Sequence, residues 1–381
     1  MAKKKRKNNK RSALKPIKLP TWLVVIGVLT IIIYSIGYMN AQRRHAFPIV
    51  FSNISTDTPD KADILFIGDD SALLFNPQIA QLINDISKNL NRPAVIYNYA
   101  DANENIFRTF YKLKQVKDLA PIVIYMGGAS EFYERLIPEN IDITYLNYKL
   151  MSNEYISVIH TLFPSFKKYL MIPDKNITLN STPEKGKFKS DEIQKYLEVY
   201  FKQYEIELRN IVNYIEKNGS TPIVLTSPVN LLDDQVNACP ASQNEEIKKE
   251  LEQIENSLEN SMVKDALAKA RELNTETFSN ARVKYLYGKA LYENGSYSKA
   301  KAELIYARSL NCTPQGAHPI INAIIKKVAN SRDVYIYDFD KELNLYFGTN
   351  ELFLGKREAQ VIYYEKLRKE LMIMIKDILT I

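Results

Sequence analysis

The chain has 381 residues, of which 46% are apolar and 25% charged, and this balance excludes a wholly disordered protein. Its formal charge of +7 comes from one end. Met1–Lys18 holds nine of the 51 basic residues and no acidic one, which leaves 42 basic against 44 acidic residues elsewhere. The body of the protein is therefore not a polyanion binder, and we expect no nucleic-acid partner.

An uncharged apolar segment follows the basic tail. Residues 19–39 are long enough, at about 1.5 Å per residue, to cross a hydrocarbon core of roughly 30 Å. Trp22 and Tyr38 lie toward the ends of this segment, and the lysine excess on its N-terminal side predicts an N-terminus in the cytoplasm. A cleaved signal peptide is the alternative, but the apolar run is long for one. The sequence thus predicts a cytoplasmic tail (1–18), a single transmembrane helix (19–39), a linker (40–61) and a periplasmic or otherwise extracytoplasmic main domain at the cytoplasmic (inner) membrane.

Short apolar runs alternate with amphipathic patterns through the rest of the chain. Buried runs rich in β-branched residues, separated by helices, predict an α/β fold with a doubly wound (flavodoxin-like), parallel five-stranded sheet. In such sheets, sites form at the carboxyl ends of the strands. The expected strands are Asp63–Ile67, Ala94–Tyr97, Pro121–Tyr125, Pro222–Thr226 and Val334–Tyr337, and the expected helices between them include Asn76–Leu90, Asn103–Leu119 and Asp191–Lys217.

Two insertions interrupt this alternation. Residues 131–190 are rich in Tyr and Phe, and this pattern is consistent with a lid over a site or with a subdomain packed on the sheet. Residues 244–310 are helical throughout. Within them, Gly288, Leu304 and Ala307 match the spacing of a tetratricopeptide repeat, in which small residues lie where two helices touch. We expect the main domain to comprise residues 62–243 and 311–381, with this helical insertion between them.

The two cysteines, Cys239 and Cys312, lie just before and just after the helical insertion. An insertion between consecutive strands leaves and re-enters its host at neighbouring points, so the two Cα atoms fit the roughly 4.4–6.8 Å separation of a disulfide. Disulfides persist outside the cytoplasm. A Cys239–Cys312 bridge is therefore predicted, with two unrelated buried thiols as the alternative.

Candidate chemistry is confined to two polar turns. The three histidines, His45, His160 and His318, have no companion ligands at metal-site spacing, so we expect no metal, and no phosphate-binding or dinucleotide fingerprint indicates a cofactor. What remains is GDDS (residues 68–71) after the first expected strand and GGASEF (127–132) after the third. Both turns fall at the sheet edge where a site is expected.

The order of these elements resembles the SGNH (GDSL-type) hydrolase family. The shared features are a GDS-like turn after the first strand, a G-x-N-E-F-like turn after the third, and a tetratricopeptide-like insertion before the last. The resemblance is closest to the membrane-anchored bacterial branch, which includes esterases and acyltransferases acting on envelope polysaccharides. It implies a serine nucleophile, an oxyanion hole formed by a backbone glycine and an asparagine, and a histidine base near the C-terminus.

Each implied residue has a substitute in this chain. Asp70 occupies the nucleophile position unless the register shifts by one residue to Ser71, and Ser130 stands at the asparagine. Asn103 stands at the second glycine, and Gly128 is the other candidate for the oxyanion hole.

The C-terminal motif lacks its aspartate and its histidine. The segment 350–367 resembles L-F-x-D-x-x-H-P with Gly355 at the aspartate and Glu358 at the histidine. A triad without its base loses several orders of magnitude in rate. Glu358 serving as a base for Ser71 is one interpretation; the other is a degenerate domain in which Ser71 caps a helix. His318 is interpreted as a structural residue or as a displaced base.

Two classes of function follow. One is a catalytically degenerate scaffold of the bacterial cell envelope, anchored in the membrane, that docks another envelope protein through its helical insertion. The alternative is an envelope esterase or O-acyltransferase acting on polysaccharide with Ser71 as nucleophile. Between them lies a domain that binds a polysaccharide without cutting it, through aromatic side chains of the 131–190 insertion.

Overall fold

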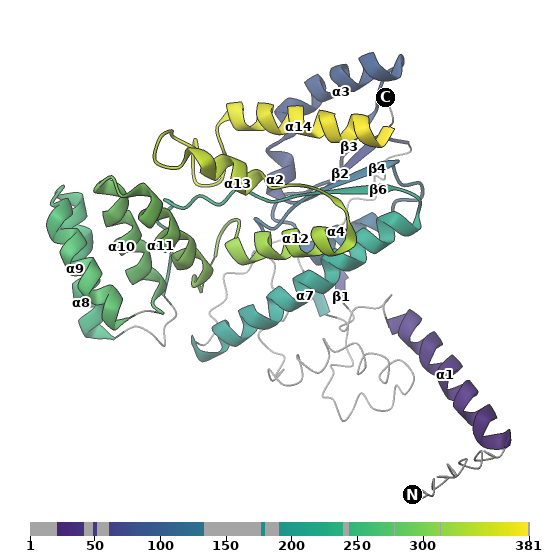
Figure 1. The fold of residues 1–381 in the computed structure, drawn as a ribbon, viewed down its shortest axis with the longest axis horizontal. Helices are drawn as coiled ribbons and strands as arrows, with labels where there is room; N and C mark the ends of the chain where they lie inside the picture. The colour runs from purple at the N-terminus through teal and green to yellow at the C-terminus, as the bar shows by residue number, and fades with distance from the viewer. Residues whose placement is uncertain are drawn as a thin grey trace, which may run out of the picture.

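The computed structural model of the chain has one parallel β-sheet at its centre, covered by helices, and a helical arm at one side (Figure 1). The arm consists of the helices between residues 244 and 310, and we call the remainder from residue 62 the sheet domain. The structure describes residues 21–41, 49–51, 61–132, 177–179, 190–238, 244–277, 279–312 and 314–379.

The central sheet has five strands, all parallel, in the order β3-β2-β4-β6-β7. Counted along the sheet domain this is the order 2-1-3-4-5 of flavodoxin-like sheets, so the predicted α/β sheet is present. Every residue of the two strands β2 and β4 is buried, as expected for strands covered on both faces. The strands are β2 (Ile64–Gly68), β3 (Ile96–Asn98), β4 (Ile122–Met126), β6 (Thr221–Leu225) and β7 (Tyr335–Tyr337).

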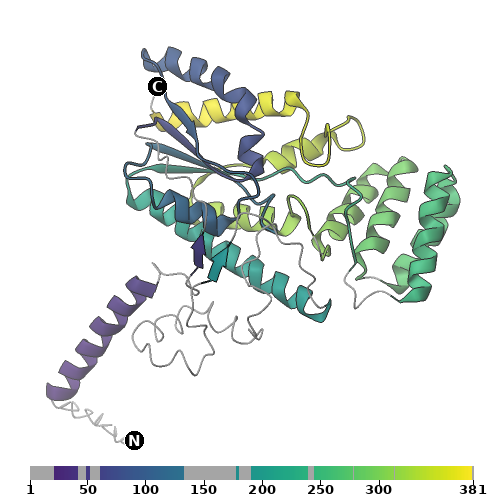
Figure 2. The ribbon, with the colours of Figure 1, turned by 180° about the vertical axis from the view of Figure 1, so that it is seen from behind.

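Helices cover both faces of the sheet, as the two views in Figures 1 and 2 show. Successive side chains of a strand point to opposite faces, so Leu65 and Ile67 enter one core while Ile64 and Phe66 enter the other. The first core is closed by α4 (Ile106–Leu113), α7 (Ser190–Lys217) and α12 (Pro319–Arg332), and the second by α3 (Asn76–Leu90), α13 (Phe339–Leu343) and α14 (Val361–Leu379).

The arm consists of two helical hairpins that pack on each other. In the second hairpin, a Cβ added to Gly288 would lie 2.7 Å from Leu304 Cγ, so the absent side chain allows the two helices to approach closely. These are the two positions at which the sequence pattern expected a small and a large residue to interlock. The hairpins are α8 (Glu245–Glu259) with α9 (Val263–Glu276), and α10 (Ala281–Glu293) with α11 (Tyr297–Ser309).

The inner side of the arm holds a stretch of the protein's own chain, which we call the connecting segment (residues 229–238). Apolar side chains of this segment, Val229, Leu231 and Val236, belong to the hydrophobic core of the arm. Its carbonyl groups accept hydrogen bonds from side chains of the arm and its C-terminal end: Tyr285 Oη to Leu232 O (2.9 Å), Arg282 Nη1 to Asp234 O (2.8 Å), Arg308 Nη2 to Asp233 O, and Asn311 Nδ2 to Gln235 O (2.9 Å).

Replacing Asn311 should loosen the arm. The buried Asn311 amide donates to Gln235 O and accepts from Asn237 N (3.1 Å), so Asn311→Ala leaves two backbone groups without these partners. We expect a loss of about 2 kcal/mol in arm stability, measured as faster amide exchange in α10 and α11 with exchange in β2 unchanged. The exposed Asn260→Ala serves as the control, and equal protection in both variants would contradict the contact's role.

The predicted disulfide is described at one end only. Cys312 is disulfide-bonded, and its N–H donates to Asn237 O (3.3 Å), two residues before Cys239. Cys239 itself lies outside the described residues, so its pairing with Cys312 stays a prediction. Most of the 131–190 insertion, including its predicted lid, also lies outside them.

Two elements near the N-terminus are described apart from the sheet domain. Helix α1 spans Thr21–Ala41, and β1 (Ile49–Phe51) pairs in parallel with β5 (Ile177–Leu179). The side chains described in α1 are those of Trp22 and residues 25–36. Within the part of the chain that the structure describes, no helix has both the length and the apolar character needed to cross a membrane. The predicted span at 19–39 is thus not established by the structure.

Candidate functional site

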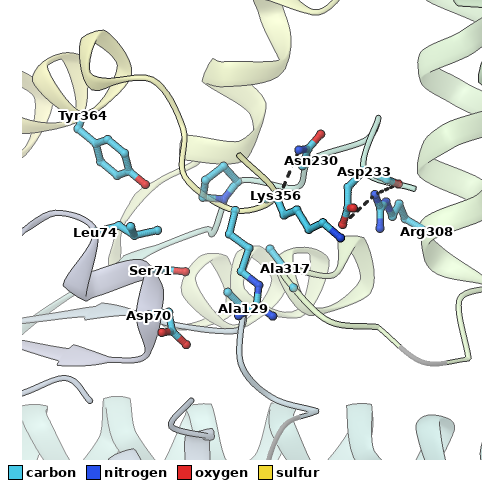
Figure 3. A pocket seen from close by; sticks show the side chains of 13 residues that line it. Asp70, Ser71, Leu74, Ala129, Asn230, Asp233, Arg308, Ala317, Lys356 and Tyr364 are labelled. Carbon is cyan, nitrogen blue, oxygen red and sulfur yellow. Dashed lines mark hydrogen bonds and ion pairs between the residues drawn. The ribbon is translucent and has the colours of Figure 1, made fainter. Parts of the chain in front are cut away.

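A narrow cleft opens at the carboxyl ends of β2, β4 and β6, the edge at which the sequence predicted a site (Figure 3). Its cavity volume is about 30 Å³. The arm contributes one residue to the lining of the cleft, Arg308 of α11. The lining residues are Asp70, Ser71, Leu74, Ala129, Pro228, Asn230, Asp233, Arg308, Gly316, Ala317, Lys356, Arg357 and Tyr364.

Asp69 fastens the turn after β2 to the turn after β4. Its side chain caps the short helix α2 (Asp70–Leu73) by accepting from Ser71 N at 2.9 Å. It also accepts from Ala129 N and Ser130 N, both at 2.7 Å. Burial raises the pKa of Asp69 to about 6, and the hydrogen bonds from these three N–H groups oppose that rise. The two polar turns found in the sequence are therefore joined by one carboxylate.

Asp70 lies where the resemblance places a nucleophile, and its carboxylate is held by two converging donors. Asp70 Oδ2 accepts from Asn103 N at 2.9 Å and from the hydroxyl of Ser130. Asn103 has a φ of 59°, a left-handed conformation that asparagine tolerates better than most residues. Asn103 and Ser130, both predicted as oxyanion-type or catalytic contributors, thus meet at one oxygen. That oxygen belongs to the protein.

Ser71 lies one residue further on, within α2. It is 4% exposed, and its side chain points into the cleft beside Leu74 (Figure 3). Its backbone N–H makes the capping bond with Asp69. The question of register raised by GDDS is therefore resolved in favour of Asp70 for the contact with Asn103 and Ser130, while both Asp70 and Ser71 line the cleft.

The predicted base is not in the cleft. Glu358 is exposed and is absent from the lining residues; its backbone carbonyl accepts from Leu354 N at 2.8 Å. Arg357, the preceding residue, lines the cleft instead. Burial lowers the pKa of Arg357, and the negative charges of Asp70 and Asp69 oppose that change. A guanidinium, one residue before the expected base, thus stands near the two aspartates.

Gly128 has a packing role in the structure. Its φ is +100°, and an added Cβ would lie 2.6 Å from Ile321 Cγ2 of α12. It is not among the residues that line the cleft. Gly128, a candidate for an oxyanion hole, instead lies where the loop passes closely over α12.

His318 is a helix cap outside the cleft lining. Its Nδ1 accepts from Ile320 N at 3.2 Å at the start of α12, and its ring lies 5.0 Å from that of Phe201. Burial lowers the pKa of His318 to about 3, with the charge of Arg308 acting in the same direction. Of the two interpretations, the structural histidine fits this placement.

Sequence patterns did not indicate Arg308, Asp233 and Asn230, which line the cleft, or the buried acid Glu131. Arg308 and Asp233 form an ion pair of 3.6 Å at the wall of the cleft, and Asn230 Nδ2 donates to Gly355 O at 3.2 Å. Beneath the turn after β4, Glu131 accepts from Tyr200 Oη at 2.5 Å, and burial raises its pKa well above the usual range. The ion pair joins segments that are far apart in the sequence, so no local pattern indicates it.

The cleft is lined by a serine hydroxyl and by the carboxylates of Asp70 and Asp233. No histidine lines it, and among the described residues no group of three or more His, Cys, Asp or Glu side chains is arranged to hold a metal ion. Ser71 has in its neighbourhood Arg357, which stays protonated, and the phenol of Tyr364, whose pKa is raised by burial. Neither is a base for a hydroxyl at neutral pH.

Comparisons with known proteins add one distant similarity. No protein-family model matches the chain, and no curated protein matches it significantly. Among solved structures, the chain is similar to a lipase/acylhydrolase from Enterococcus faecalis at 11% sequence identity. That alignment covers 83% of this chain and 96% of the other, with a TM-score of 0.35. A similarity of this size carries no argument about activity.

Proposed function

We propose that this protein is a non-catalytic, SGNH-like interaction protein in which an aspartate has replaced the nucleophile. One observation carries the proposal: the Asp70 carboxylate accepts from both Asn103 N and the Ser130 hydroxyl. Donors of this kind stabilise the negative oxygen that develops during acyl transfer. Here a permanent negative oxygen of the protein occupies them, so an acyl oxygen would have to displace a bound carboxylate.

The charge around Ser71 supports the same conclusion. Activating a serine hydroxyl requires a neighbouring group that accepts its proton. Arg357 stands in the cleft instead, and Glu358 is exposed outside it. The two carboxylates that line the cleft are engaged elsewhere, Asp70 with Asn103 N and the Ser130 hydroxyl and Asp233 with Arg308. The alternative function, an esterase or O-acyltransferase of envelope polysaccharide with Ser71 as nucleophile, is therefore the less supported of the two.

The proposed setting is the outer side of a bacterial cytoplasmic membrane. The basic tail, the apolar segment 19–39 and the exposed apolar side chains of α1 between Val25 and Ile36 support a single-pass anchor with the main domain outside. We further propose that an envelope protein docks on the arm. Because the inner side of the arm already holds the connecting segment, that partner would bind the outer surfaces of α8, α9 and α11.

A fluorophosphonate probe and a short acyl ester test the absence of catalysis. The purified protein should show neither labelling nor ester turnover above background, and Ser71→Ala should behave identically. Ser298→Ala, a substitution at an exposed serine of α11, is the matched control. Labelling or turnover that disappears in Ser71→Ala but persists in Ser298→Ala would overturn the proposal and restore the esterase function.

A further inference from the structure

We propose that a groove between the arm and the sheet domain binds the quaternary ammonium group of a small soluble molecule. The groove shares only Asn230 with the cleft beside Asp70. It is formed by residues 229–232 of the connecting segment, by Tyr292 of α10, and by Asn344 and residues 347–355, which lie between α13 and α14. Its cavity volume of about 480 Å³ falls within the range of ligand pockets, roughly 300–1,000 Å³.

The lining of the groove carries a single charge, and that charge is negative. Glu351 is the only acidic or basic residue among the lining residues. Its carboxylate forms no ion pair within the described part of the chain, and its bond from Gln360 Nε2 is long, at 3.5 Å. Glu293 adds a second negative charge beside Tyr292. A cation therefore suits the groove better than an anion does.

Two basic residues that adjoin the lining are held by other groups. Lys301 Nζ donates to Asn344 O at 2.6 Å. Lys356, which follows the last lining residue, lies 3.9 Å from a carboxylate oxygen of Asp234. Neither lysine is among the lining residues, so Glu351 remains available to an added cation.

Two aromatic rings line the groove together with aliphatic side chains. The centroids of the Tyr292 and Phe347 rings lie 5.3 Å apart, with the ring planes at 60°. The face of an aromatic ring attracts a cation that lies within about 6 Å of its centroid. A quaternary ammonium group has no N–H, so it can contact Leu231, Leu352 and Leu354 without leaving a donor unpaired, whereas a primary ammonium brings three donors.

Contacts between the arm and the sheet domain hold the walls of the groove in place. Gly348 packs so closely on Tyr297 of α11 that an added Cβ would lie 2.3 Å from Tyr297 Cγ. In the connecting segment, Val229 N donates to Asp340 Oδ1 of α13 at 2.8 Å. A ligand therefore meets walls that are already positioned, which lowers the entropy cost of binding.

Titration calorimetry of the full-length protein in a maltoside detergent tests the inference with four probes. Choline carries the quaternary ammonium group, and 3,3-dimethyl-1-butanol is its neutral counterpart, with carbon in place of nitrogen. Ethanolamine carries a primary ammonium group, and glycerophosphocholine represents a lipid headgroup, whose phosphate has no basic partner in the lining. We expect millimolar binding of choline and about fivefold weaker binding of each of the other probes.

Two variants assign the binding to this groove. Glu351→Gln removes the charge and should weaken choline binding about fivefold, whereas Phe347→Leu removes a ring and should weaken it about threefold. Glu272→Gln, at an exposed glutamate of α9, should bind choline like the unaltered protein. If Phe347→Leu fails to fold, Glu351→Gln still decides, because Glu351 is exposed.

Absent choline binding, equal or tighter binding of any of the other three probes, or an affinity unchanged by Glu351→Gln would each overturn the inference. Ester turnover, which tests the proposed function, depends on Ser71 and not on this groove. The two experiments can therefore fail independently.

Discussion

Gly68→Ala is expected to abolish folding of the sheet domain. Gly68 ends β2 with a φ of +135°, and an added Cβ would lie 2.0 Å from Met126 O and 2.6 Å from Met126 C. These are backbone atoms of the paired strand β4, so no side-chain rotation relieves the clash. The cost should exceed about 4 kcal/mol, a range reached only by the most disruptive substitutions. The measurement is the free energy of unfolding in urea, or the loss of soluble protein.

Gly219→Ala is the matched control for this substitution. Gly219 also has a positive φ, of +77°, but nothing lies within 4 Å of its added Cβ. The variant therefore incurs only the conformational strain, about 1–2 kcal/mol. Equal destabilisation by the two variants would show that the close approach of β2 to β4 is not what requires glycine at position 68.

The buried carboxyl groups should lower the stability of the protein as the pH rises, whereas the buried neutral His318 acts in the opposite sense below about pH 6.5. Burial raises the pKa of Asp69 and of Asp340 to about 6, above the value of 3.8 for an exposed aspartate, and raises that of Glu131 further. The folded protein then binds more protons than the unfolded chain, so the free energy of unfolding falls as the pH rises from about 4 to 8. Between pH 5 and pH 8 Asp69 alone corresponds to about 1.4 kcal/mol. Urea denaturation at pH 5 and pH 8 measures the difference.

Glu131→Gln should flatten this pH dependence. A glutamine keeps an oxygen that accepts from Tyr200 Oη and Ile106 N but does not ionise, so the loss of stability toward pH 8 should become smaller. Glu272→Gln, at an exposed position on α9, should leave the pH dependence as it was. A dependence equally steep in Glu131→Gln would show that Glu131 does not contribute to it.

The strands and helices of the sheet domain were predictable because buried segments show a local pattern of apolar residues in the sequence. Runs such as Pro121–Tyr125 are apolar at every position, and β4 forms there with its bounds shifted by one residue, at Ile122–Met126. The helix expected over Asn103–Leu119 is shorter in the structure, Ile106–Leu113, because Asn105 caps its start through a bond from Arg108 N. Capping and termination depend on single side chains, which a periodic pattern does not specify.

The position of the candidate site at the sheet edge was predictable, but the contacts between individual residues of the two turns were not. The order of strands places both polar turns at one edge of the sheet. Only the structure shows that Asp69 accepts from the backbone N–H of Ser130 and Asp70 from its hydroxyl. Near the C-terminus, Arg357 lines the cleft whereas Glu358, the residue expected as a base, is exposed. Residues 350–360 form an irregular loop with isolated bridges, which lacks a period that would fix the orientation of Arg357 and Glu358.

The connecting segment couples ligand binding in the cleft to the docking of the arm on the sheet domain. Asn230 and Asp233 line the cleft, while Leu231 and Val236, a few positions away, lie in the core of the arm. Any ligand that binds better when this backbone is in place must, by linkage, hold the arm against the sheet domain with the same free energy. Conversely, a partner that moved the arm away from the sheet domain would lower the affinity of the cleft for a ligand. Ligand binding in the cleft and the position of the arm are thus coupled through the ten residues of the connecting segment.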